Sequence, residues 1–281
     1  AVLDKLRYKF GYTDYKHTEF DGGIPETQFS NETFENRLEF DHQEIAGFKG
    51  TFGFQSTHST FSAIGSHAGH GHDDHEEEHE GHEEHNEEEH HAEEETGHGH
   101  VVPKSDINNY GFFLVESRKH GDFTYELGGR VELQEIDTED GQHFSHILLS
   151  GSASVAWKIN DQHQLSLAGT HTERAPQIQE LLNDGEHHAT RSYEIGNPNL
   201  GKEYSNNLDL RYQFNSRWFN AELNLFHNWV NDYIYQQRDS RIFNETHAEL
   251  QDPDECHISD VCMPVMATQQ RNSVFKGFEA K

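Results

Sequence analysis

The chain has 281 residues, only 32% of them hydrophobic, and a formal net charge of −30 at pH 7. A chain this acidic is a poor partner for the phosphate backbone of nucleic acids, so no nucleic-acid binding is expected. No apolar segment reaches the roughly 18 residues of a transmembrane helix, and the N-terminus does not have the pattern of a signal peptide.

The N-terminal part predicts three strands. Apolar and polar side chains alternate over residues 3–15, the period-of-two pattern of a strand with one apolar face. Residues 16–32 contain Asp21-Gly22-Gly23 and Pro25 and are expected to form a loop. Two further alternating runs follow, at 33–41 and from Phe48 to Phe54.

A long connection, 56–108, contains the histidine-rich stretch, residues 67–100. This stretch has 11 of the 24 histidines and 14 of the 51 acidic residues, and its largest apolar side chain is alanine. It cannot bury enough surface to offset the entropy of ordering, so it is expected to be disordered. A solvated acidic segment without a ligand is the alternative interpretation.

Imidazole nitrogens and carboxylate oxygens together favour Zn²⁺ and its first-row neighbours. The candidate metal ligands of the histidine-rich stretch are His70, His72, His75, His79, His82, His85, His90, His91, His98 and His100. The pattern His75-Glu76-Glu77-Glu78-His79 matches the helical H-E-x-x-H sequence of zinc proteases. A tract of His and Glu produces this pattern by chance, and no enzyme activity is expected.

Seven more alternating runs are expected in the second part of the chain: 109–117, 123–135, 146–158, 163–173, 203–214, 218–234 and one beginning at Val274. Long loops are expected at 174–202 and 236–272. Cys256 and Cys262 lie in the second of these loops, where their short separation favours a disulfide and an oxidising compartment. A metal pair with the adjacent His257 is the alternative.

Ten one-sided strands joined by alternating short and long connections predict an all-β fold, an antiparallel transmembrane β-barrel with long extracellular loops. The apolar face would contact outer-membrane lipid and the polar face would line the lumen. A soluble sandwich or solenoid is the alternative. Ten strands with uncapped ends make an incomplete barrel, so the barrel is expected to be partial and the chain a fragment.

Residues 170–209 carry a specific resemblance. They contain Arg174-Ala175-Pro176, Glu180-Leu181, a Gly-x-His-x-Ala-Thr segment from Gly185 to Thr190, Glu-x-Gly-Asn-Pro-x-Leu from Glu194, and Glu-x-Ser-x-Asn from Glu203. This series resembles the strand-loop-strand signature of TonB-dependent outer-membrane receptors. Phe275 to Ala280 is similar to the strand that commonly follows. Within that family, the histidine-rich stretch and the two-cysteine loop resemble zinc-uptake receptors of the ZnuD type.

The resemblance implies a bacterial outer-membrane protein with extracellular loops that imports zinc. Such receptors have a barrel of about 22 strands closed by an N-terminal plug, and they take energy from the TonB complex through that plug. The implied partners are therefore the TonB complex and a zinc ion or zinc carrier, with Zn²⁺ as the transported ligand. The plug, the first strands and the closing strand are expected to lie outside this sequence.

A tighter site nearer the lumen is expected to involve His187 and His188, because the Gly-x-His-x-Ala-Thr segment places His187 at a loop base. His171 is the next candidate, expected on the polar, lumen-facing side of its run beside Glu173. Two other functions remain open: a receptor for siderophores or other metal complexes, using Arg191, Tyr193, Tyr235, Arg238 and Arg241, and a surface protein that sequesters metal without transport.

Overall fold

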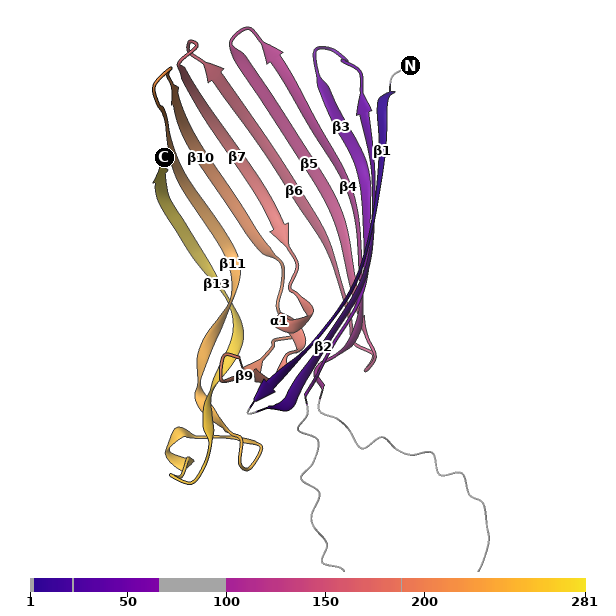
Figure 1. The fold of residues 1–281 in the computed structure, drawn as a ribbon, viewed down its shortest axis with the longest axis vertical. Coiled ribbons are helices and arrows are strands. Elements are labelled where there is room, and N and C mark those ends of the chain that lie inside the picture. The colour runs from indigo at the N-terminus through magenta and orange to yellow at the C-terminus, as the bar shows by residue number, and fades with distance from the viewer. Residues whose placement is uncertain (1–2, 22, 66–99, 188) are drawn as a thin grey trace, which may run out of the picture.

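The computed structural model describes residues 3–21, 23–65, 100–187 and 189–281. One curved sheet dominates this part of the chain, and its ten long strands lie side by side in a partial barrel (Figure 1). The long strands are β1 (Leu3–Asp21), β2 (Ile24–His42), β3 (Lys49–Gly65), β4 (His100–His120), β5 (Phe123–Thr138), β6 (His143–Lys158), β7 (His163–Arg174), β10 (Glu203–Asn215), β11 (Asn220–Asn244) and β13 (Cys262–Ala280).

These ten strands confirm the ten alternating runs, and neighbouring long strands pair antiparallel throughout. Three short strands also belong to the sheet within the described residues: β8 (Asp184–His187), β9 (Ser192–Ile195) and β12 (Glu249–Gln251). β9 pairs parallel to β13, from Val265↔Tyr193 to Ala267↔Ile195. The short elements α1 (Ile178–Leu182) and η1 (Pro253–Glu255) complete the fold, and no described helix has the length and apolar character needed to span a membrane.

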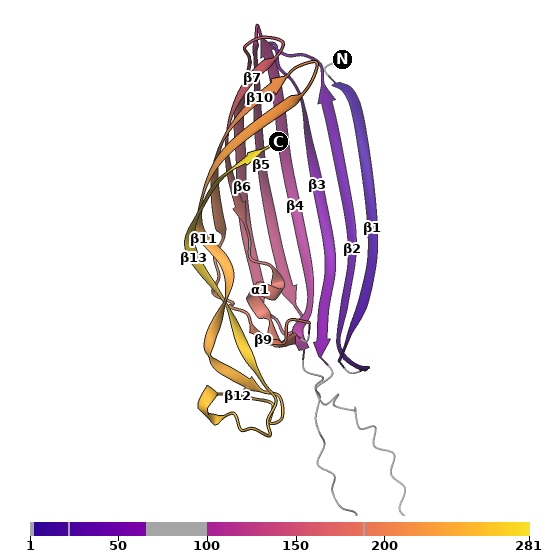
Figure 2. The same cartoon turned by 60° about the vertical axis from the view of Figure 1, so that its left-hand side comes forward.

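The two ends of the sheet differ in their connections. At one end, here called the turn end, short segments join the strands at 43–48, 121–122, 159–162 and 216–219. At the opposite end, here called the loop end, the connections include 139–142, 175–202 and 245–261 (Figure 2). The predicted contrast between short turns and long loops is therefore present, although the connections after β1 and after β5, both at the loop end, are also short.

The strands extend further toward the loop end than the alternating runs suggested. The prediction of a loop at 16–32 is wrong: β1 and β2 continue as a paired ribbon, and His17 stacks on Phe29 with ring centroids 4.4 Å apart. Likewise β3 and β4 extend into the range 56–108, and β11 and β13 into 236–272. Cross-strand pairing continues the ladder where turn-forming residues had suggested its end.

The two faces of the sheet have opposite character. Exposed apolar side chains cover the convex face, and rows such as Phe54–Phe112–Val131–Leu149 run across several strands. The concave face carries ion pairs, among them Arg7 and Arg37 with Glu39. This arrangement matches a wall that faces lipid on one side and a polar lumen on the other.

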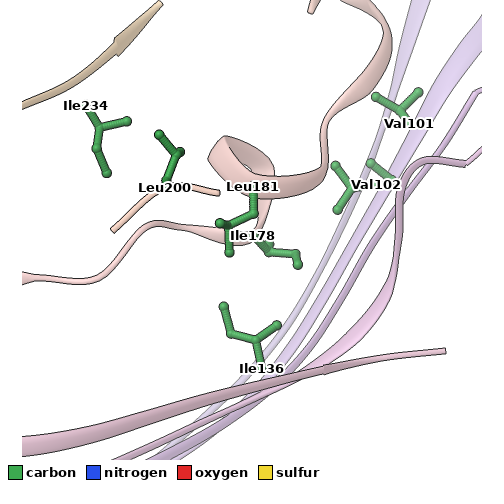
Figure 3. Close-up of a cluster of buried hydrophobic side chains, with 8 residues drawn as sticks. Val101, Val102, Ile136, Ile178, Leu181, Leu200 and Ile234 are labelled. Carbon is green, nitrogen blue, oxygen red and sulfur yellow. The ribbon is translucent and has the colours of Figure 1, made fainter. Parts of the chain in front are cut away.

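The main buried core lies on the concave face near the loop end. There α1 places Ile178 and Leu181, which are 2% and 1% exposed, among Val102, Ile136 and Leu200 (Figure 3). Two margins of the sheet remain open within the described residues. One is the outer edge of β1, and the other is the turn-end half of β13, which pairs with β11 on one side only.

Candidate functional site

The segment 175–202 folds back onto the concave face at the loop end. Pro176 precedes α1, and the Glu180 carboxylate accepts a hydrogen bond from the backbone N–H of Gln177 (2.8 Å), which caps the helix. The same carboxylate pairs with Arg174 at 2.8 Å and so attaches the helix to the end of β7. The sequence thus fixes both the start of α1 and its position against the sheet.

Two glycines allow the return of the chain after α1. A Cβ atom at Gly196 would lie 2.6 Å from the Leu181 carbonyl, and one at Gly185 would lie 2.8 Å from Val101. These approaches bring the β8–β9 hairpin into contact with α1 and β4. The hairpin then adds to the sheet through β13.

This folding places the imidazole of His187 between two carboxylates. Its Nε2 lies 3.6 Å from Glu19 Oε1 and its Nδ1 lies 3.3 Å from Glu194 Oε1. The Nδ1 atom also lies 2.8 Å from the hydroxyl oxygen of Thr190. Glu19 and Glu194 have side chains only 19% and 13% exposed, while His187 is 33% exposed, so the imidazole is the accessible member of the three.

The two carboxylates of this cluster differ in how they are held. Asn183 donates its amide N–H to Glu194 Oε2 at 2.8 Å. Among the described residues, Glu19 Oε2 is buried without a hydrogen-bond partner. A buried carboxylate oxygen with no donor is costly, and a cation would satisfy it.

A cavity of about 540 Å³ adjoins the cluster. Its lining includes Glu19 of β1, Arg191 after β8, Glu245 of the β11–β13 connection and Met263 of β13. The cavity therefore lies at the loop end, and Glu19 is the member of the cluster that lines it.

The prediction that His171 faces the lumen is wrong. His171 shares the parity of Leu165, Leu167 and Gly169, and continuous pairing with β10 places it on their convex face. Its Nδ1 lies 2.8 Å from Asn206 Oδ1, and its Nε2 lies 3.7 Å from Glu173. The Glu173 carboxylate is held by Lys202 at 2.7 Å, so His171 belongs to a polar patch outside the concave site.

The other predicted ligands fall largely outside the described residues, namely His70, His72, His75, His79, His82, His85, His90, His91, His98 and His188. His100 begins β4. No group of three or more His, Cys, Asp or Glu side chains is arranged as a metal site in the part of the chain that the structure describes. The His187 cluster is therefore a pair of carboxylates facing one imidazole.

Cys256 and Cys262 form a disulfide across the β11–β13 connection. Of the side chains considered for a metal complex, Arg241 is already paired with Asp239 at 2.9 Å, an interaction that lowers the pKa of the Asp239 carboxyl. Tyr193 donates its hydroxyl to Asp184 at 2.8 Å. Both side chains hold the protein together at the loop end.

Sequence reasoning missed Glu19 and Glu194. Glu194 lies inside the Glu-x-Gly-Asn-Pro-x-Leu signature, but nothing in the signature indicates which histidine it meets. Glu19 was assigned to a loop. Its parity with Arg7 and Lys9 on the polar face of β1 is the signal that places it in the lumen.

The family model for the TonB-dependent receptor-like β-barrel matches residues 3–281. Among solved structures, the chain is similar to the copper transporter OprC (15% identity, TM-score 0.65, 99% of this chain and 40% of that one). It is also similar to the FrpB iron transporter of Neisseria meningitidis, F5-1 variant, at 15% identity and a TM-score of 0.61. That match covers 100% of this chain and 39% of the transporter.

A third similar structure is that of the Serratia marcescens hemophore receptor HasR, a double mutant solved with its hemophore HasA and heme. The identity is 14% and the TM-score 0.63, and the match covers 90% of this chain and 39% of the receptor. The chain thus spans about 40% of the length of these proteins. TonB-dependent receptor barrels are outer-membrane proteins. Because the family model covers nearly the whole chain, this chain belongs to the TonB-dependent receptor β-barrel family.

Proposed function

We propose that the chain is part of an outer-membrane receptor that imports a transition-metal ion, with Zn²⁺ as the first cargo and the TonB complex as the energy source. The observation that carries the proposal is the His187 imidazole between Glu19 and Glu194 on the concave face. Nε2 faces Glu19 and Nδ1 faces Glu194, so one ion would bind Nε2 and Glu19 while Glu194 orients the imidazole through Nδ1. Imidazole and carboxylate ligands suit Zn²⁺, and Cu²⁺ and Ni²⁺ accept them too.

The histidine-rich stretch joins β3 to β4, both of which reach the loop end (Figure 1). In this proposal the loop end is extracellular, and the ten histidines named above collect metal at many exchangeable sites. Weak sites release an ion readily, so the His187 cluster receives it from them. Zinc or a zinc-loaded carrier is the partner on the outer side.

Charge supports a bare cation as cargo. The chain carries a net charge of −30, and Glu19 and Glu194 lie on either side of His187. A field of this sign concentrates cations and repels anionic chelates. A receptor for a metal complex remains the second candidate, because the adjoining cavity of about 540 Å³ presents Arg191 and exceeds what one ion needs.

The test is zinc uptake and zinc binding by the receptor that carries this chain. We expect His187→Ala and Glu19→Gln to weaken zinc binding by roughly 10–100-fold, the usual effect of removing a ligand or its immediate partner. His143→Ala is the matched control, since His143 lies at the same end of the sheet and pairs with Asp137 at 2.7 Å, away from the His187 cluster. Calorimetric titration with Zn²⁺, Cu²⁺ and Ni²⁺ measures the affinity and the order of preference.

Deletion of 67–100 separates the candidate functions. Metal capture followed by import predicts loss of growth only when zinc is scarce. Loss of growth on a ferric chelate, with zinc uptake intact, would favour the metal-complex receptor. Unchanged uptake of both, together with lost surface-bound zinc, would favour a sequestering surface protein.

A further inference from the structure

The convex, lipid-facing side of the sheet carries an apolar groove of about 680 Å³ across β4, β5, β6, β7 and β10. Its floor follows one register row, Leu127–Ala153–Gly169–Leu208. The next row toward the turn end, Tyr125–Val155–Leu167, forms one wall. Small side chains in the middle of the floor and larger ones beside it make the hollow.

The floor is open above its glycine. A Cβ atom at Gly169 would have no other atom within 4 Å, and the same holds for Gly129 in the following row. Leu127 and Leu208, at the two ends of the floor, are 48% and 47% exposed. The hollow is therefore unfilled by the protein and large enough to accept part of another molecule.

The length of the groove suits one acyl chain. Five strands are separated by four inter-strand spacings, about 19 Å in total, and one leaflet of a bilayer has a hydrocarbon depth of about 15 Å. Register rows run perpendicular to the strands, and the strands are tilted (Figure 1). The groove therefore rises obliquely from Leu208 in the apolar belt toward the turn end at β4.

The end of the groove nearest the turn end is lined by a positively charged side chain, Arg118. Arg118, His120 and Phe48 line this end, and the Arg118 guanidinium carbon lies 5.3 Å from the centre of the Phe48 ring. Glu116, on the same face of β4, is bound to His42 Nε2 at 2.7 Å. Among the described residues no carboxylate forms an ion pair with Arg118, which leaves its charge available.

We propose that this groove binds one phospholipid of the inner leaflet, with an acyl chain over Ala153 and Gly169 and an anionic headgroup phosphate on Arg118 and His120. The assignment to the inner leaflet rests on the proposed orientation, in which the turn end is periplasmic. Guanidinium groups bind phosphate oxygens in a planar, two-pronged geometry. The apolar floor excludes water from the chain and the cation selects the headgroup.

Two variants test the two halves of the site. Gly169→Leu adds an apolar side chain to the floor at a position where the new Cβ meets no other atom within 4 Å. Arg118→Gln removes the cation. The matched control is Lys119→Gln, the next residue along β4. Lys119 lines a separate polar cavity of about 780 Å³ on the concave face, together with Glu126 and Asn224. The readout is native mass spectrometry of the purified receptor after incorporation into nanodiscs that contain phosphatidylglycerol and phosphatidylethanolamine.

We expect the unmodified protein and Lys119→Gln to retain one phosphatidylglycerol per receptor. Arg118→Gln should weaken its retention roughly fivefold, the effect of one cation near an anionic headgroup, and Gly169→Leu should abolish it. Equal retention by all four proteins, or no preference for the anionic lipid, would overturn the proposal. The zinc affinity of all four proteins should be the same. The lipid proposal, tested by Gly169→Leu, and the proposed function, tested by His187→Ala, can therefore fail separately.

Discussion

Tyr193 links three parts of the loop end through a single side chain. Its ring stacks on Phe243 of β11 with centroids 4.2 Å apart, and its hydroxyl donates to Asp184 at 2.8 Å. Burial raises the pKa of Tyr193, and the hydrogen bond to the Asp184 carboxylate raises it further. The neutral phenol is thus the form that holds β8 and β9 in place against β11 and β13.

This shift predicts an alkaline sensitivity of the hairpin. An unperturbed tyrosine ionises near pH 10, so the stabilisation is complete below about pH 10 and is lost as the pH rises through the higher folded-state pKa. Hydrogen exchange of residues 184–195 should accelerate over that range. Tyr193→Phe keeps the ring contact, costs roughly 1.5–3 kcal/mol at neutral pH, and should remove the alkaline step. An alkaline step that persists in Tyr193→Phe would assign it to another group.

At the scale of elements, alternation of apolar and polar residues was sufficient to predict the ten long strands, because one face of each strand meets an apolar environment. It was insufficient for the ends of the strands. β11 continues to Asn244 and β13 begins at Cys262, since Phe243, Met263 and Val265 form a small cluster of their own there. That cluster depends on Tyr193 and Ile195 from a distant segment, which no local pattern reveals.

The disulfide acts on one connection only. Cys256 and Cys262 are six positions apart, and Cys262 is the first residue of β13, where it pairs with Asn244. The loop between the two cysteines lies beyond this last pair. Loop-closure entropy for so short a loop is worth about 2 kcal/mol. Replacing both cysteines by serine should speed proteolysis within 245–261 and leave the thermal unfolding of the barrel unchanged. A lowered unfolding temperature of the whole barrel would show that the connection supports the sheet.

At the scale of the whole molecule, the sheet separates an apolar convex face from a polar concave face. Leu225 and Asn224 are neighbours on β11 that point to opposite sides: Leu225 is 44% exposed on the apolar face, and Asn224 lines the polar cavity. In a bilayer, Leu225→Arg should cost roughly 2–4 kcal/mol, whereas Asn224→Arg should cost little. Gel mobility of folded and unfolded barrel in lipid vesicles measures both. Equal costs would contradict the assignment of the convex face to lipid.

The candidate site also belongs to this scale. Glu19, His187 and Glu194 come from the first strand and from the segment between β7 and β10, and they meet only because the sheet curves and that segment folds into its concave side. The resemblance over residues 170–209 pointed to His187, but its partner on β1 follows from curvature alone. The wrong prediction for His171 has a different cause. His171 is an even number of residues from Leu165 and Leu167, so the sequence alone already placed all three on the same face of β7.

The open margins described above have a consequence for how this wall sits in a membrane. Along the outer edge of β1, peptide N–H and C=O groups point sideways with no partner among the described residues. Hydrocarbon offers them neither donor nor acceptor, and each orphaned group costs several kcal/mol there. Both edges of the sheet therefore favour pairing with another strand. Backbone from another strand, whether of the same protein or of a neighbouring copy, must hydrogen-bond to those edges before lipid can surround the sheet.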